Sequence, residues 1–79
     1  MMPGMKTPSV GRIVHYVAYG TPGGEYREGA HRAAIITEVT PGLSEVSLAI
    51  LNPTGMFFNQ CVPHSSTFAP GSWHWPEIV

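Results

Sequence analysis

Apolar and polar residues alternate over short stretches of this chain with a period of two, which is typical of β-strands. The pattern predicts strands over residues 12–19, 31–39, 45–51, 56–62 and 72–76. A 3.6-residue period, which would indicate an amphipathic helix, is absent from the sequence. The sequence therefore predicts an all-β domain, either a small five-stranded SH3-like barrel or a strongly curved antiparallel sheet.

The residues between these segments indicate how the strands are joined. Asn52-Pro53-Thr54-Gly55 is typical of a type I turn, because Asn bonds its own backbone and Pro presets the second φ angle. The ten residues of 20–29 include four glycines and predict a long loop, a candidate for contact with a ligand or partner. Residues 1–9 have no period and predict a flexible leader before one small β domain over residues 10–79.

Strand alternation also predicts which side chains share a face. In the segment 56–62, it separates Phe57, Asn59 and Cys61 from Met56, Phe58, Gln60 and Val62. In the segment 31–39, it separates Ala33, Ile35, Thr37 and Val39 from Arg32, Ala34, Ile36 and Glu38. The two tryptophans of the last segment, Trp73 and Trp75, are expected on one face.

Composition adds an expectation about assembly. With 79 residues, nine glycines, eight prolines and 11% charged residues, the chain is short, rich in turns and poor in charge. Folded domains of this size usually need disulfides, a metal or oligomerisation for stability. Cys61 is the single cysteine, so an internal disulfide is excluded. Strands that are apolar on both faces then favour a homo-oligomer.

The charge balance narrows the class of partner. Four basic and five acidic residues leave a formal net charge of −1, without the basic cluster that long nucleic acids require. A small anionic ligand with one or two phosphates is still compatible with this charge. The sequence shows neither a signal peptide nor an apolar stretch of membrane-spanning length, so we expect a cytoplasmic protein without a membrane partner.

Two chemical alternatives involve Cys61. Cys61 and His64 have a Cys-x-x-His spacing that could serve nucleophilic catalysis, but the chain contains no Asp to orient the imidazole. Cys61, His64 and His74 could meet around a metal, although the paired ligand spacing of structural zinc sites is missing. Glu25 and Glu28 are more typical of a solvated loop than of an acid–base pair. We therefore expect no catalytic residues, no cofactor and no metal.

Binding of a small ligand accounts for more of the unusual residues. Aromatic rings can stack on a nucleobase, amides and hydroxyls can bond its edge, and cationic side chains can hold phosphate. Asn59 and Gln60 are consecutive amides on opposite faces of one strand, so one of them needs a buried partner or a ligand. The candidate ligand-binding residues are Arg12, His15, Tyr16, Arg32, Asn52, Thr54, Phe58, Asn59, Gln60, Trp73 and Trp75.

Three segments carry a resemblance to other proteins. VGRIVHY at 10–16, LNPTG at 51–55 followed by FFN, and WHWP at 73–76 together resemble small proteins of actinobacteria and their phages, which bring no assigned activity. In size, all-β pattern and expected assembly, the chain is also similar to phage sponge proteins of the anti-CBASS and anti-Thoeris type. That second resemblance implies binding without cleavage, at a site between subunits.

These observations lead to one functional hypothesis and one alternative. We expect a non-enzymatic phage-type sponge that sequesters a small nucleotide immune signal, such as a cyclic dinucleotide, and so inhibits host anti-phage defence. The alternative is a structural or adaptor protein, such as a phage particle component, that binds protein through its aromatic surface.

Overall fold

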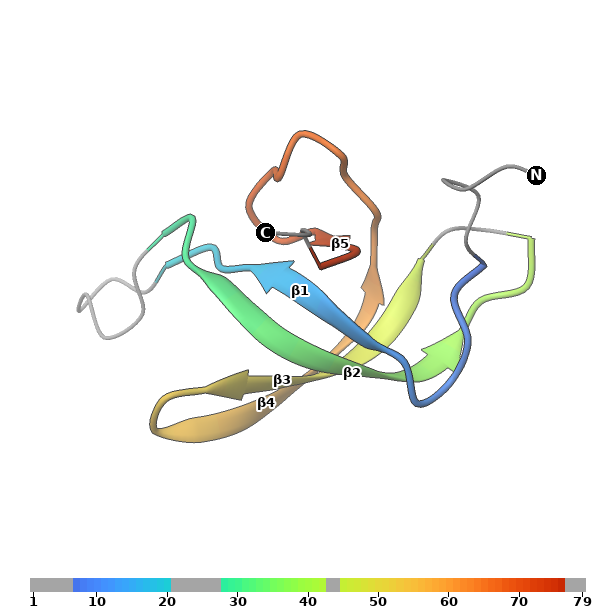
Figure 1. Cartoon of the computed structure of the whole chain (residues 1–79), viewed down its shortest axis with the longest axis horizontal. Helices are drawn as coiled ribbons and strands as arrows, with labels where there is room; N and C mark the ends of the chain where they lie inside the picture. The colour runs from blue at the N-terminus through green and yellow to red at the C-terminus, as the bar shows by residue number, and fades with distance from the viewer. Residues whose placement is uncertain (1–6, 21–27, 43–44, 77–79) are drawn as a thin grey trace.

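The computed structural model describes residues 7–20, 28–42 and 45–76, and within them it forms one antiparallel sheet of five strands (Figure 1). The sheet order is β4-β3-β2-β1-β5. The strands are β1 (Ile13–Val17), β2 (His31–Val39), β3 (Val46–Asn52), β4 (Gly55–Val62) and β5 (Trp73–His74). No helix occurs in these described ranges, which confirms the all-β fold class.

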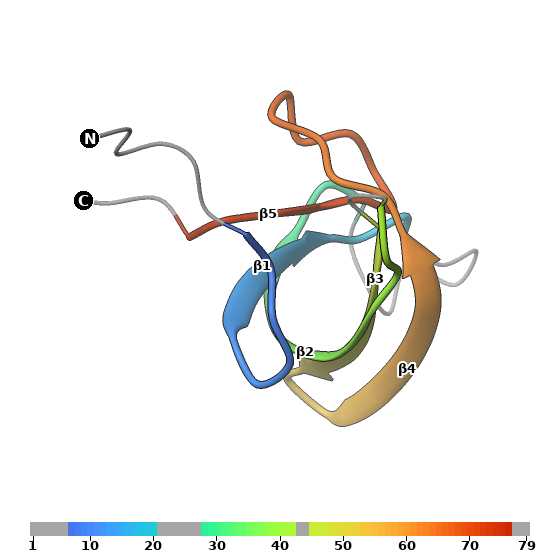
Figure 2. The same ribbon diagram turned by 90° about the vertical axis from the view of Figure 1, so that its right-hand side faces the viewer.

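The sheet is strongly curved and nearly closes on itself. Figure 2 shows β1 to β4 curling around a central space, with β5 crossing its open side. The segment after β4 completes this side: the Trp73 amide donates to the Pro63 carbonyl at 2.9 Å, and the Ser65 amide donates to the Trp73 carbonyl at 3.0 Å. A parallel bridge between His64 and Trp73 lies at the same place. The architecture is therefore a small, nearly closed barrel.

The concave face of the sheet holds the core. Alternate residues of the strands point inward, as the period of two requires. The core cluster consists of Val14, Tyr16, Ala34, Ile36, Val46, Leu48, Ile50, Val62 and Trp73. In the register, Ala34 faces Ile50, and Ile50 faces Phe57 on β4. Phe57 and Asn59 therefore belong to the concave face, whereas Met56 and Phe58 belong to the convex face.

Two irregularities change the alternation near one end of the barrel. The register of β2 with β3 shifts between Ile36 and Glu38, and Val39 packs against the core. The register of β3 with β4 shifts between Val46 and Leu48, opposite the segment of β4 that contains Cys61 at φ 56°. β-Bulges of this kind insert one extra residue and reverse the faces beyond it. The expectation that Val62 shares a face with Phe58 was therefore wrong, as was that of Val39 facing away from Ile36.

Most of the predicted boundaries agree with the structure within two residues. β2 has the predicted limits, and Pro53 and Thr54 form the turn between β3 and β4. β1 and β5 are shorter than predicted, while Trp73 and Trp75 do pack together, with ring centroids 5.4 Å apart. Most of the predicted leader and of the 20–29 loop lie outside the described residues. At the base of that loop, the Gly29 amide donates to the Ala18 carbonyl at 2.9 Å.

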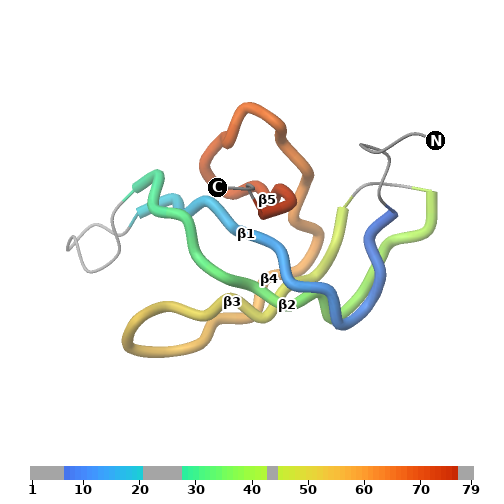
Figure 3. The backbone as a smooth tube through the Cα atoms, viewed as in Figure 1, coloured from blue at the N-terminus to red at the C-terminus, as the bar shows by residue number. Residues whose placement is uncertain are grey.

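The segment between β4 and β5 forms a long excursion beside the sheet. Figure 3 shows this tube, in orange, rising from the end of β4 and returning to β5 next to β1. Within the described ranges, no helix has the length and apolar character needed to cross a membrane.

Candidate functional site

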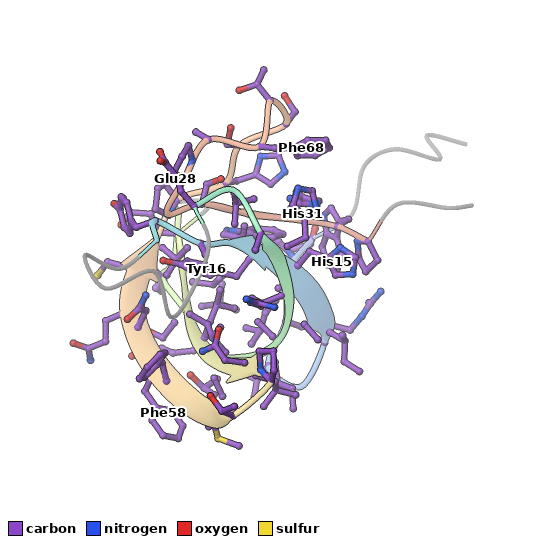
Figure 4. The ribbon with its side chains drawn as sticks, turned by 90° about the vertical axis from the view of Figure 1, so that its left-hand side faces the viewer. His15, Tyr16, Glu28, His31, Phe58 and Phe68 are labelled. Carbon is purple, nitrogen blue, oxygen red and sulfur yellow. The ribbon has the colours of Figure 1, made fainter. Side chains whose placement is uncertain are left out.

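A pocket of about 140 Å³ opens at one end of the concave face. We call it the concave pocket. Its walls come from β1, from the residues that follow β1, and from the β3–β4 hairpin. It is lined by Tyr16, Ala18, Tyr19, Gly20, Ile50, Asn52, Phe57 and Asn59. Figure 4 looks into this end of the barrel, and the side chain of Tyr16 points into the interior.

Tyr16 connects two walls of the concave pocket. The Asn59 Nδ2 atom donates a hydrogen bond to the Tyr16 hydroxyl at 3.3 Å. Burial raises the pKa of Tyr16 above its ordinary value, nearby Tyr19 raises it further, and the bond from Asn59 opposes the shift. Tyr16 is 6% exposed, and at neutral pH it contributes a protonated phenol to the lining of the pocket.

Two buried donors lie on the same face. Nδ2 of Asn52 and Nε of Arg32 are inaccessible to solvent, and neither has a hydrogen-bond partner among the described residues. Tyr16 faces Arg32 across β1 and β2, and the register of β2 with β3, continued by one residue, places Arg32 opposite Asn52. Buried polar atoms are nearly always hydrogen-bonded in folded proteins. These two atoms therefore lack the hydrogen bond that buried donors normally form, which makes this part of the concave face a candidate site for an acceptor.

The concave face thus brings together four of the predicted ligand-binding residues, Tyr16, Arg32, Asn52 and Asn59. Phe58, one of the aromatic residues predicted to stack on a base, is instead 73% exposed on the convex face. Phe57 lines the pocket in its place. Trp73 is 1% exposed and belongs to the core, so its ring presents no face to a ligand.

Three further candidates lie away from the concave pocket. Arg12 places its guanidinium carbon 5.1 Å from the centre of the Trp75 ring, which is the geometry of a cation–π contact. Trp75 also meets Trp73 edge to face. Thr54 lies exposed in the β3–β4 turn. None of these three residues lines the pocket, so the structure does not gather all the predicted site residues in one place.

A second, wider pocket of about 380 Å³ lies near the bulges of β2 and β4. Its lining includes Phe58, Asn59 and Gln60, but it also contains the carboxylate of Glu38, which accepts a hydrogen bond from the Ser47 hydroxyl at 3.0 Å. A carboxylate repels an anionic ligand. The concave pocket, with a neighbouring guanidinium, is therefore the better candidate for a nucleotide.

A different group of residues gathers on the convex face. His15 of β1, His31 of β2 and His74 of β5 place their ligand nitrogens within 4.8 Å of one another. We call these three residues the histidine cluster. In the described part of the chain it is the one group of histidine, cysteine or acidic side chains close enough to share a metal ion. Cys61, His64 and His74 therefore do not form the metal site that their spacing allowed.

The histidine cluster was not predicted, and the reason is its topology. From the sequence, His15 is a candidate for phosphate because imidazole can carry a positive charge, and His74 is a candidate metal ligand together with Cys61 and His64. In the structure, His15 is the register partner of His74 through the pairing of β1 with β5. That pairing joins distant parts of the chain, and the pattern within each segment carries no information about it.

Comparison with known proteins adds nothing to this geometry, since no family model, curated protein or solved structure matches the chain. The two resemblances given by the sequence, to small actinobacterial and phage proteins and to phage sponge proteins, are not tested by these comparisons and stay predictions.

Proposed function

We propose that this chain is a non-enzymatic binding module that holds a small nucleotide by its base in the concave pocket. The observation that carries the proposal is the pair of buried donors, Asn52 Nδ2 and Arg32 Nε, without partners in the described residues. Asn52 lines the concave pocket together with Tyr16 and Phe57, and Arg32 is the register partner of Tyr16 on the same face. Rings for stacking and donors for the acceptor edge of a base are the elements by which proteins recognise unpaired bases.

The charge of the site supports an anionic ligand. Arg32, on the same face as the concave pocket, carries a planar guanidinium that matches phosphate geometry. The described lining of the concave pocket contains no carboxylate that would oppose an anion. With its Nε buried, Arg32 interacts with an anion more strongly than an arginine in full contact with water would.

The volume of the pocket sets the size of the ligand part it encloses. A cavity of about 150 Å³ in another protein binds benzene, so about 140 Å³ accommodates one ring system rather than two. A cyclic dinucleotide carries two bases and would need two such pockets. In our proposal, two copies of this chain supply them and bind the ligand between subunits of a homo-oligomer.

The chemistry of the lining favours retention of the ligand. Its described residues include no thiol, carboxylate or imidazole to act as a nucleophile or general base. In our proposal, the bound nucleotide is released unchanged, and its removal from solution is the biological effect. Sequestration of an immune signal, with inhibition of host anti-phage defence, is the form of this function that the resemblance to sponge proteins implies.

The test is retention of a nucleotide by the purified chain. The protein is incubated with a panel of mononucleotides and cyclic dinucleotides, separated from free ligand, and heated, and the released material is analysed by mass. We expect an intact nucleotide to be recovered.

Asn52→Ala should weaken retention about 10-fold or more, since it removes a buried hydrogen-bond donor. Gln60→Ala, an exposed amide outside the pocket, is the matched control and should bind normally. A panel without any retained nucleotide, or one that is recovered chemically altered, would overturn the proposal.

The convex face favours a second candidate, the structural or adaptor protein. Ile13 faces Ile35, Ile35 faces Ala49 and Ala49 faces Phe58, so an apolar row crosses four strands. Ile13, Ile35 and Phe58 are all exposed. An apolar row of this kind is suited to contact with another protein. This candidate predicts that no nucleotide changes the melting temperature, whereas Phe58→Ser abolishes binding to a protein partner.

A further inference from the structure

We infer that the histidine cluster is a binding site for a divalent transition metal of the Zn²⁺ class. His15, His31 and His74 come from three strands, and Figure 4 shows His15 and His31 together on the outside of the barrel, close to Phe68. Imidazole nitrogen is a preferred ligand of zinc and of its neighbours in the first transition series. The site lies on the face of the sheet opposite the concave pocket, so it is independent of the proposed nucleotide function.

The separation of the imidazoles suits a metal. Nitrogens bound at about 2.0–2.1 Å to tetrahedral zinc lie roughly 3.3 Å apart. The ligand nitrogens of the cluster all lie within 4.8 Å of one another, so small rotations of the side chains bring them to that distance. The ring centroids of His31 and His74 are 4.8 Å apart and those of His15 and His74 are 5.5 Å apart, each pair at a steep angle. Such edge-to-face pairs let ring edges converge on one point, as metal ligands must.

The backbone holds two of the ligands in place. His15 and His74 are register partners across β1 and β5. Val17, two residues after His15 on β1, is the register partner of His31 on β2. All three histidines therefore project from adjacent strands toward one side of the sheet. Ligands mounted on paired strands need little ordering when a metal binds, which favours affinity.

Phe68 packs against two of the three imidazoles of the histidine cluster. Its ring centroid lies 4.2 Å from that of His74 and 5.2 Å from that of His31. The backbone of Phe68 adopts φ 63°, a conformation that bulky residues rarely occupy outside functional or strongly constrained sites. Ser65 fixes this segment, because its hydroxyl accepts hydrogen bonds from the Thr67 and Ala69 amides at 3.3 and 3.2 Å. The loop thus holds the Phe68 ring against the imidazoles of His31 and His74, with the backbone of Phe68 in a strained conformation.

Burial and exposure within the cluster suggest how the metal would enter. His74 is 3% exposed, His15 is half-buried and His31 is exposed, so solvent reaches the cluster from the His31 side. Three protein ligands are the number found in zinc sites that keep a fourth position open. A bound ion would also join β5 to β1 and β2, providing a cross-link for a short chain whose single cysteine excludes an internal disulfide.

The test is metal titration of the full chain, purified without a histidine tag and stripped with chelator. Co²⁺ serves as the spectroscopic probe for Zn²⁺, and the substitution is His31→Ala, because His31 is exposed and outside the core. The matched control is His64→Ala, an exposed histidine outside the cluster. We expect one Co²⁺ per chain with the intense visible bands of a tetrahedral site, displaced by Zn²⁺. His31→Ala should weaken binding by more than the roughly 10–100-fold that loss of a supporting residue costs, while His64→Ala leaves it unchanged.

A second measurement on the unaltered chain does not depend on the folding of a variant. Nitrogen-15 spectra of the imidazoles should show that Zn²⁺ shifts the resonances of His15, His31 and His74 and leaves those of His64 in place. Binding that depends equally on His64, that survives His31→Ala, or that shifts none of the three cluster resonances would overturn the proposal.

Discussion

The Asn59 Nδ2 atom donates a hydrogen bond to the Tyr16 hydroxyl, joining β4 to β1 across the concave face although 43 residues separate them in the chain. β1 and β4 are not neighbours in the sheet, so this bond acts across the barrel rather than along it. It also positions the polar edge of the concave pocket, because both residues line that pocket. The stability of the barrel and the shape of the site therefore share one interaction.

Removal of either partner should destabilise the domain. Tyr16→Phe leaves the Asn59 amide without this acceptor, and we expect the free energy of unfolding to fall by about 1 kcal/mol. Asn59→Ala should have an effect of similar size. The two substitutions share one bond, so the double variant should lose less than the sum of both. Urea denaturation of the four proteins measures this cycle, and strict additivity would show that the bond contributes nothing.

Alkaline pH should destabilise the fold through Tyr16. Burial raises the pKa of Tyr16 above the ordinary value of 10.0, so the folded state holds this proton more tightly than the unfolded state does. The resulting stability is fully present below pH 10 and is lost as the pH rises through the folded pKa. Denaturation between pH 8 and 11 should show a steeper decline for the natural chain than for Tyr16→Phe. Parallel declines in the two proteins would contradict the assignment.

The sequence predicts most of the strands because alternation is a local property. The limits of β2 and the turn at Pro53 and Thr54 follow from residues that are neighbours in the chain. The inward choice of Phe57 over Phe58 depends on the pairing of Ile50 with Phe57, which alternation alone does not specify. The bulge at Cys61 reverses the alternation without a glycine to mark it. The histidine cluster depends on the pairing of β1 with β5, the most distant of the pairings in the sheet.

Two glycines with positive φ offer a matched test of the packing beside the pocket. Gly71 has φ 82°, and a Cβ atom there would overlap the ring of Tyr19, a pocket residue. Gly11 has φ 92° with open space around it. Gly11→Ala should cost about 1–2 kcal/mol from backbone strain alone. Gly71→Ala should cost more, because Tyr19 must also move. Thermal denaturation compares the two, and equal losses would exclude close packing of Tyr19 on Gly71.

Cys61 should be more tolerant of glycine than of a β-branched residue. Its φ of 56° lies in the left-handed region, where a side chain costs about 1–2 kcal/mol. Cys61→Gly removes that strain at an entropic cost of about 0.5–1 kcal/mol, so its stability should equal or slightly exceed that of the natural chain. Cys61→Val should be less stable. Because Cys61 is exposed, the native protein should also react with a thiol reagent without denaturant. A more stable valine variant would contradict the bulge.

Self-association should depend on the apolar row of the convex face. Phe58 ends that row and is 73% exposed, which is unusual for so large an apolar side chain. Burying it at an interface would contribute about 1.5–3 kcal/mol, so Phe58→Ser should raise the dissociation constant of the homo-oligomer about 10-fold or more. Val10 is 67% exposed but lies outside the strands, and Val10→Ser is the control. Sedimentation equilibrium measures the masses. A natural chain that is monomeric at all concentrations, or equal effects of both substitutions, would exclude this face as the contact between copies.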